Sequence, residues 1–150
     1  MKTGLIIGGV ILLVLLVLGG AGAGYFFYER NQANATSKAY VDESVPAIVS
    51  NWSKDELVKR ESPQLAQSVS DDDITAMFTK LGGLGPMKSY DGATGGAHVR
   101  ISHTGLHATA SYVAAATFQN AKANVKIDLV QINGNWLIQG FGVGAPNPAQ

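Results

Sequence analysis

The sequence predicts an α+β protein in which an N-terminal transmembrane helix precedes a domain of about three helices packed on a curled four-stranded antiparallel meander. Three observations carry this prediction. The first 28 residues contain a single charged side chain, the middle of the chain has apolar residues at helical spacing, and from Met87 onward apolar residues alternate with a period of two. A chain of 150 residues allows about one compact domain.

The composition excludes several classes of function. Lys and Arg number 11 and Asp and Glu number 11, so the chain lacks the clustered positive charge that gives proteins affinity for nucleic acid. Without cysteine it has no disulfide framework, thiolate metal site, catalytic cysteine or lipidated cysteine anchor. We therefore expect no nucleic-acid partner.

An uncharged stretch from Gly4 to Tyr28 is long enough to cross a membrane. As a helix its 25 residues rise about 37 Å, compared with roughly 30 Å for the hydrocarbon core. Lys2 precedes the stretch, so the positive-inside rule predicts a cytosolic stub at residues 1–3, a signal-anchor helix in the inner or plasma membrane, and an extracytoplasmic domain. Gly20 and Gly24 have the spacing of a packing face for another membrane helix.

The same segment also fits a cleaved signal peptide. Lys2, the apolar core and the small residues Ala21-Gly22-Ala23 follow the three-part pattern of such leaders, which predicts secretion to the periplasm after cleavage near Ala23. The aromatic residues from Tyr25 to Tyr28 favour the uncleaved anchor, because aromatic side chains suit the membrane interface.

The extracytoplasmic domain is predicted to span residues 37–145, with a tail at 146–150. Residues 29–36 form either a linker or an extension of the membrane helix. The first helix of the domain covers Ser37 to Asn51, with a kink at Pro46.

Two further helices follow from their capping residues. Ser53 and Glu56 have the spacing of a capping box, which starts a second short helix that Ser62-Pro63 ends. Ser70 caps a third helix, which has three acids in its first turn and apolar residues at helical spacing up to Leu81.

The strands are predicted from their turns. Asn133-Gly134 indicates a two-residue type I′ hairpin, which pairs Gln131 with Trp136, Leu129 with Ile138, and Ile127 with Gly140. Hairpins around Asn120-Ala121 and Thr104-Gly105 pair Ala116 with Val125 and Ile101 with Ala108. The glycine-rich stretch 92–96 is predicted to be a flexible connection between strands.

One face of this sheet is almost wholly apolar, so the helices must cover it. It carries Val99, Ile101, Ala108, Ala110, Tyr112, Ala114, Ala116, Phe118, Val125, Ile127, Leu129, Gln131, Trp136, Ile138 and Gly140. Small residues on it allow a pocket for an apolar ligand or lipid, lined by Tyr112, Ala114, Gln131, Trp136 and Gly140. The opposite face carries a partly apolar patch, the preferred interface, made of Val113, Val130, Ile132, Leu137 and Phe141.

Neither a catalytic group nor a metal site is predicted. The apolar face offers no acid and no histidine to move a proton. Metal binding is not favoured at the histidines, His98, His103 and His107, because they fall on different sides and heights of the sheet. The three consecutive acids from Asp71 to Asp73 diverge around a helix axis. We expect no enzymatic activity and no cofactor.

The order of three helices followed by an antiparallel meander resembles the nuclear transport factor two-like superfamily, a cone-shaped α+β fold. The resemblance is carried by Trp52-Ser53-Lys54-Asp55-Glu56-Leu57, by Phe78-Thr79-Lys80-Leu81-Gly82, and by the closing segment from Asn133 to Phe141. That ending is similar to the last hairpin of small membrane-anchored bacterial members with no assigned activity. Members range from ketosteroid isomerases and polyketide cyclases to periplasmic domains of type IV secretion machines, so the resemblance does not select a function.

Together these observations predict a non-catalytic scaffold, assembly or accessory subunit of a membrane complex. Its expected partners are the membrane and either further copies of itself or other subunits. The alternative is a binder of a small apolar ligand or lipid in the cone. An isomerase-like or cyclase-like enzyme ranks third.

Overall fold

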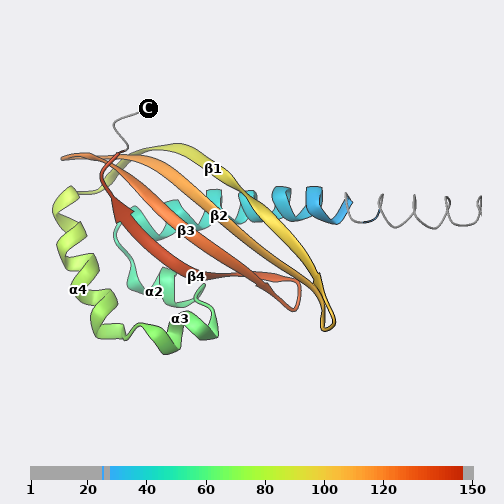
Figure 1. Ribbon diagram of the computed structural model, residues 1–150. Helices are drawn as coiled ribbons and strands as arrows, with labels where there is room; N and C mark the ends of the chain where they lie inside the picture. Colours follow the sequence, from blue (N-terminus) through green and yellow to red (C-terminus); the bar gives the residue numbers. More distant parts are fainter. Residues whose placement is uncertain (1–24, 26–27, 147–150) are drawn as a thin grey trace, which may run out of the picture. The chain divides into compact units, whose positions relative to one another are not determined.

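The computed structural model describes Tyr25 and residues 28–146 (Figure 1). The chain divides into two compact units, Met1–Gln32 and Ala33–Gln150. The second unit is an α+β domain with a four-stranded antiparallel meander, as expected. Most of the predicted membrane segment 4–28, including Gly20, Gly24 and the cleavage point near Ala23, lies outside the described residues. Within the part that is described, no helix is both long and apolar enough to cross a membrane.

A single helix runs through residues 28–49. Residues 29–36 are therefore helical and continuous with the first helix of the domain, while the membrane helix that they were expected to extend lies mostly outside the described residues. The helix runs through Pro46, whose carbonyl oxygen accepts a hydrogen bond from the Ser50 backbone N–H (3.0 Å). Its buried face consists of the predicted apolar residues Val41, Val45, Ile48 and Val49.

Three short helices and a 3₁₀ turn connect this helix to the sheet. They are α2 (Lys54–Val58), α3 (Pro63–Ser68), α4 (Asp71–Leu81) and η1 (Gly82–Leu84). The predicted caps of α2 and α4 are confirmed, since Ser53 accepts from the Glu56 backbone and Ser70 forms a reciprocal capping box with Asp73. Ser62-Pro63 was wrongly expected only to end a helix. Ser62 caps α3 and Pro63 opens it, because the first turn of a helix tolerates a residue without an N–H group.

The sheet has the strand order β1-β2-β3-β4, with β1 at Met87–Ser102, β2 at Gly105–Phe118, β3 at Lys122–Ile132 and β4 at Asn135–Gly144. Asn133 and Gly134 both have positive φ (51° and 79°), which confirms the type I′ turn. The other two turns lie one residue earlier than expected, so Ala114 pairs with Val125 and Val99 with Ala108. A two-residue shift in register keeps every side chain on its predicted face.

A β-bulge in the last hairpin changes the predicted faces at its far end. Gln131 pairs with Trp136 and Leu129 with Ile138 as expected, but Asp128 then pairs with Gly140, which leaves Gln139 as an extra residue. The extra residue turns Phe141 toward the helices, where its ring contacts that of Phe78. Gly140 moves to the opposite face, since a Cβ built on it meets the side chain of Asp128. Both residues were predicted on the wrong face.

The glycine-rich stretch 92–96 is part of β1 rather than a flexible connection. Gly95 lies opposite Tyr112, so close that a Cβ on it would be 2.0 Å from the Ser111 carbonyl oxygen. A glycine at this position allows the two backbones to approach.

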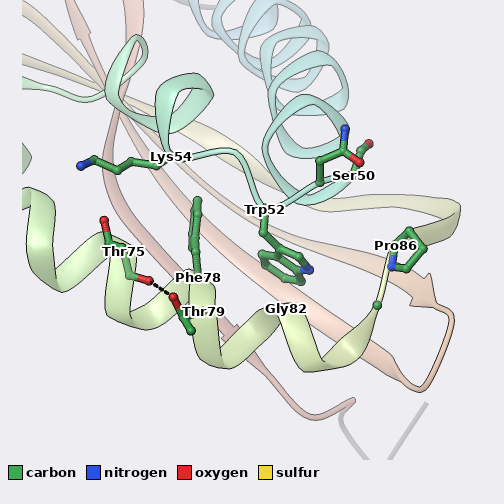
Figure 2. A pocket seen from close by; sticks show the side chains of 10 residues that line it. Ser50, Trp52, Lys54, Thr75, Phe78, Thr79, Gly82 and Pro86 are labelled. Carbon is green, nitrogen blue, oxygen red and sulfur yellow. Dashed lines mark hydrogen bonds between the residues drawn. The ribbon is translucent and has the colours of Figure 1, made fainter.

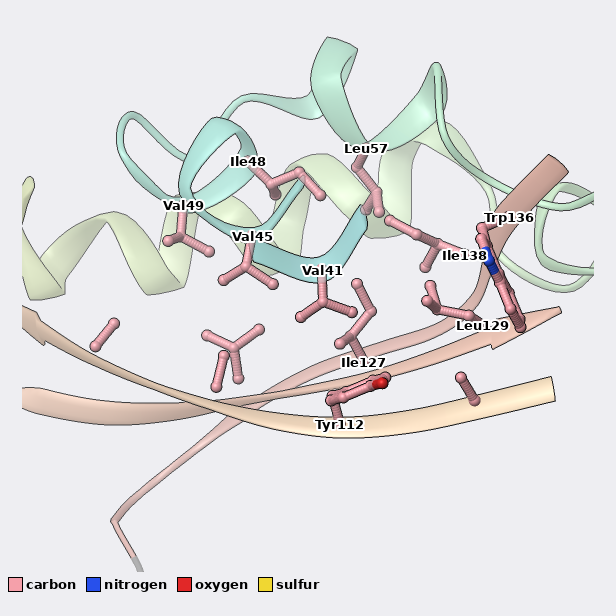
Figure 3. Close-up of a cluster of buried hydrophobic side chains, with 14 of the residues drawn as sticks. Val41, Val45, Ile48, Val49, Leu57, Tyr112, Ile127, Leu129, Trp136 and Ile138 are labelled. Atoms are coloured by element: carbon pink, nitrogen blue, oxygen red, sulfur yellow. The ribbon is translucent and has the colours of Figure 1, made fainter. Parts of the chain in front are cut away.

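The core lies between the helices and one face of the sheet, here called the inner face (Figure 3). Val41 and Val45 from the first helix and Leu57 from α2 pack against Ile127, Leu129 and Ile138 from the strands. The buried polar side chains are small hydroxyls, Ser37, Ser44 and Ser62. Among the described residues no Asp, Glu, Lys, Arg or His side chain is buried.

One edge of the sheet is covered by the segment between α2 and α3. The Ser62 N–H donates to the Ile138 carbonyl and the Ile138 N–H donates to the Arg60 carbonyl (2.7 Å each), which forms a short parallel bridge at Glu61. This bridge satisfies backbone groups of β4 that an edge strand otherwise exposes.

Candidate functional site

A groove of about 570 Å³ lies between the end of the first helix and α4 (Figure 2). Residues 50–52 and Lys54 form one wall, and α4 forms the other. The lining comprises Ser50, Asn51, Trp52, Lys54, Thr75, Phe78, Thr79, Gly82, Gly85 and Pro86.

Two aromatic rings line the groove, those of Trp52 and Phe78, and both belong to a row of four rings in contact. Trp52 stacks on Phe118 with a centroid distance of 5.2 Å and meets Phe78 edge-on at 5.8 Å. Phe78 in turn meets Phe141 edge-on at 6.1 Å. Stacked and edge-to-face arrangements are the favoured geometries of aromatic pairs, so these two contacts hold the indole of Trp52 in place.

Trp52 has two properties that set it apart from an ordinary core residue. Its backbone has φ 50°, a left-handed conformation that is uncommon and strained for a bulky side chain. Its indole Nε1 is buried and has no hydrogen-bond partner among the described residues. Figure 2 shows the indole in the groove wall with Nε1 on the side of Pro86. Such strain and such unpaired donors cluster at ligand sites.

Most polar side chains at the rim of the groove form hydrogen bonds or ion pairs within the domain. The Thr75 hydroxyl donates to the Asp71 carbonyl (2.9 Å) and the Thr79 hydroxyl donates to the Thr75 carbonyl (2.7 Å). The ammonium of Lys54 pairs with Asp71 at 3.2 Å. Since Lys54 is the only ionisable residue of the lining, the groove offers surface for binding but no acid or imidazole to move a proton.

The groups with shifted pKa values lie away from the groove. Partial burial opposes ionisation of Asp42, but hydrogen bonds from Lys38 and Tyr90 (2.7 Å each) outweigh it and hold the pKa of this carboxyl below its usual value. Burial and the same bond to Asp42 raise the pKa of Tyr90. Burial also raises the pKa of Glu61.

The pocket predicted on the inner face does not coincide with this groove. Ala114 and Trp136 are buried in the core, and the Tyr112 hydroxyl lies 2.9 Å from Ser37 Oγ. Gln131 is near the last turn and donates to the Gly134 carbonyl. With Gly140 turned to the opposite face, none of the five predicted residues lines the groove.

The opposite face of the sheet, here called the outer face, is built from rungs of paired residues. Thr109, Val130 and Leu137 form one rung, and Val113 with Lys126 forms another. Between them lies a polar rung in which Ser111 Oγ donates to Asp128 Oδ1 (2.6 Å) and Gly140 completes the row. The face is therefore flat and mixed in polarity, with two apolar spots.

Four of the five predicted interface residues lie on the outer face. Val113 is 42% exposed, while Val130, Ile132 and Leu137 are half-buried. Val130 pairs with Leu137 as expected. Phe141 is the exception, because the bulge turns it to the inner face, where its ring contacts that of Phe78.

The histidines are exposed around the outer end of the first hairpin. His107 Nε2 lies 2.7 Å from Thr104 Oγ1. No group of three acids or histidines in the described ranges comes close enough to hold a metal ion.

Comparison of the chain with protein-family models, with curated proteins and with solved structures finds no match. The resemblance to the nuclear transport factor two-like superfamily therefore stays a prediction.

The sequence reasoning missed the groove although it singled out Trp52 and Phe78 in the motifs of that resemblance. The available signal was the pair Trp52-Ser53, where a large aromatic residue directly precedes a helix cap. Neither the left-handed backbone of Trp52 nor the bulge that brings Phe141 beside Phe78 has a local sequence signature.

Proposed function

We propose that the chain is a membrane-anchored, extracytoplasmic and non-catalytic assembly subunit that associates with a second copy through the outer face of its sheet. The observation that carries the proposal is the unequal covering of the sheet. All described helices pack on the inner face, and the outer face presents Val113, Val130 and Leu137 without a covering element among the described residues. Partly apolar exposed faces mark association surfaces.

Two further features support this proposal. The outer face carries both signs of charge, Lys126 and Asp128 at 4.0 Å, so two copies can meet without like-charge repulsion. Neither the groove nor the core contains an acid or histidine placed to transfer a proton. The uncharged stretch from Gly4 to Tyr28 supports the anchor by its length and composition.

The oligomeric state of the full chain in nanodiscs or mild detergent tests the association. The double variant Val130→Lys and Leu137→Lys places two charges at the centre of the outer face, and we expect it to be monomeric where the unaltered protein is dimeric. The matched control is Gln67→Lys with Ala76→Lys, two exposed positions on α3 and α4. A monomeric parent, or a dimer that survives the outer-face charges, contradicts the proposal.

The groove supports a second candidate function, the binding of a small ligand with an apolar body and a hydrogen-bond acceptor. The unpartnered Nε1 of Trp52 is the specific observation in its favour, because a ligand carbonyl would satisfy this donor after a small adjustment of the wall.

Native mass spectrometry of the purified full chain tests the second candidate. We expect a co-purifying small molecule that is lost in Thr79→Phe, which fills the groove, and is retained in Ala76→Phe, which adds the same side chain to α4 at a position outside the lining. Equal retention in both variants, or no adduct in the parent, contradicts ligand binding in the groove.

A further inference from the structure

The tip of the β1–β2 hairpin carries an exposed apolar pair. Ile101 is 71% exposed and Leu106 is 46% exposed, and the two are direct cross-strand partners. They continue the inner face of the sheet beyond the core, since Val99 and Ala108, the next pair inward, still pack against it. Ile101 was predicted to be covered by a helix, but the hairpin extends past the helices.

Arg100 is the charged residue beside this pair, and it is a cation. Arg100 pairs with His107 on the opposite face of the hairpin, and His103 lies in its turn. The sequence contains no acidic residue between Asp91 and Asp128, a stretch that includes all of β2 and β1 from Gly92 onward. The tip is therefore apolar with one cation, Arg100, and no acid beside it, whereas the acids of the domain lie mainly on its helices.

The tip lies at the same end of the second unit as the first residues of that unit, Ala33 and Asn34. The side-chain oxygen of Asn34, next to the first residue of that unit, accepts a hydrogen bond from the Ala97 N–H (2.7 Å). Ile101 is four residues further along the strand, roughly 13 Å beyond this contact. Figure 1 shows the β1–β2 turn at the same end of the sheet as the β3–β4 turn.

We propose that this tip is a membrane-contact element that inserts Ile101 and Leu106 into the interface of an anionic bilayer. Arg100 lies at the depth of the lipid phosphates and binds them. A protruding apolar tip with cationic and no anionic neighbours fits a lipid surface, because apolar burial and attraction to anionic headgroups then act together. The inference depends on the proposed membrane anchorage, which brings the bilayer within reach.

The full chain contains no cysteine, so a single introduced cysteine gives a unique labelling site for the test. An environment-sensitive fluorophore is attached in Leu106→Cys and, separately, in Ile101→Cys, with Gln67→Cys on α3 as the control. The labelled chains are placed in nanodiscs of phosphatidylcholine with or without phosphatidylglycerol, and brominated lipids serve as quenchers.

We expect the brominated lipids to quench the label at 101 or 106 about threefold more than the label at 67, in discs with the anionic lipid. Arg100→Glu in the Leu106→Cys background lowers this quenching, because it replaces attraction to phosphate with repulsion. Equal quenching at 106 and 67, or quenching that does not respond to Arg100→Glu, overturns the inference.

Two controls distinguish the lipid contact of the tip from membrane anchorage and from contact with a second copy. Carbonate extraction of the parent protein reports anchorage on its own, so an anchored chain with an unquenched tip overturns only the tip inference. A chain that carbonate releases overturns the anchor, and quenching on vesicles then still decides the tip. A label at 106 that is shielded equally in lipid-free detergent identifies a second copy as the occupant and contradicts the lipid contact.

Discussion

The two faces of one sheet have opposite designs in this protein. On the inner face Ala114, Val125, Ile127 and Leu129 are completely buried, and the buried Tyr112 hydroxyl is bonded to Ser37. On the outer face the same strands carry hydroxyls, charges and glycines. Because side chains alternate along a strand, both designs come from one stretch of sequence.

The inner face is therefore expected to supply most of the stability of this domain. Inner-face residues are fixed by the shape of their neighbours, so substitutions there leave cavities or clashes. Outer-face residues such as Val113 and Val130 are exposed or half-buried, so substitutions there should cost less.

The largest contrast is expected between neighbouring residues of β3. Ile127→Ala removes a side chain that is 0% exposed, and the free energy of unfolding should fall by about 4 kcal/mol through lost burial and a residual cavity. Val130→Ala on the outer face should cost about 1 kcal/mol or less. Denaturant unfolding of a chain beginning at Ala33 measures both, and similar losses would refute the division between the faces.

The close approach of the β1 and β2 backbones at Gly95 should make the protein sensitive to a single added methyl group. Gly95→Ala places a Cβ 2.0 Å from the Ser111 carbonyl, so β1 and β2 must separate, and the free energy of unfolding should fall by about 3 kcal/mol. Gly142→Ala is the matched control in β4, since its Cβ meets nothing within 4 Å. Thermal unfolding of the two variants distinguishes steric conflict from a general intolerance of alanine in the sheet.

Removal of a side-chain hydroxyl should lower the free energy of unfolding more on the inner face than on the outer face, but this contrast should be smaller than the two above. Tyr112→Phe removes a buried hydrogen bond to Ser37 and should cost about 1 kcal/mol. Ser111→Ala removes the solvent-exposed bond to Asp128, which water replaces readily, and should cost clearly less. A double-mutant cycle of Tyr112→Phe with Ser37→Ala checks that the effect belongs to this pair.

The smallest effect is a pH dependence at the margin of the inner layer. The pKa of Asp42 is lowered in the folded state by Lys38 and Tyr90, so its contribution to stability is present above the unfolded-state pKa. This contribution is lost as the pH falls below about 4 and through the folded-state pKa. Asp42→Asn should flatten the acid limb of the stability profile; an unchanged limb would show that the carboxylate gains nothing from its partners.

Much of the fold follows from local sequence signals, and the exceptions have physical reasons. Ser53, Ser70 and the turn Asn133-Gly134 act within a few residues, so their roles were predictable. The bulge at Gln139 was not, because an extra residue in a strand depends on how β4 meets its neighbour. It alone reversed the predicted faces of Gly140 and Phe141.

The candidate sites were likewise predictable only where local sequence patterns determine them. The outer-face residues Val113, Val130 and Leu137 were predictable from the period of two, since a register shift of two residues preserves faces. The row of aromatic rings that includes the groove residues Trp52 and Phe78 also joins Phe118 and Phe141, so it draws on four separate parts of the chain. Contacts between such distant residues follow from the assembled fold and not from any short pattern.

Two long-range contacts set the order in which this domain can be completed during synthesis. The indole N–H of Trp136 donates to Thr36 Oγ1 (3.0 Å), and Ile138 forms the bridge to Glu61. The first helix leaves the ribosome about 100 residues before β4 does. Its apolar face, including Val41 and Val45, must therefore wait for the last strand, and a chain that terminates before Trp136 is expected to be a substrate for proteases instead of a folded domain.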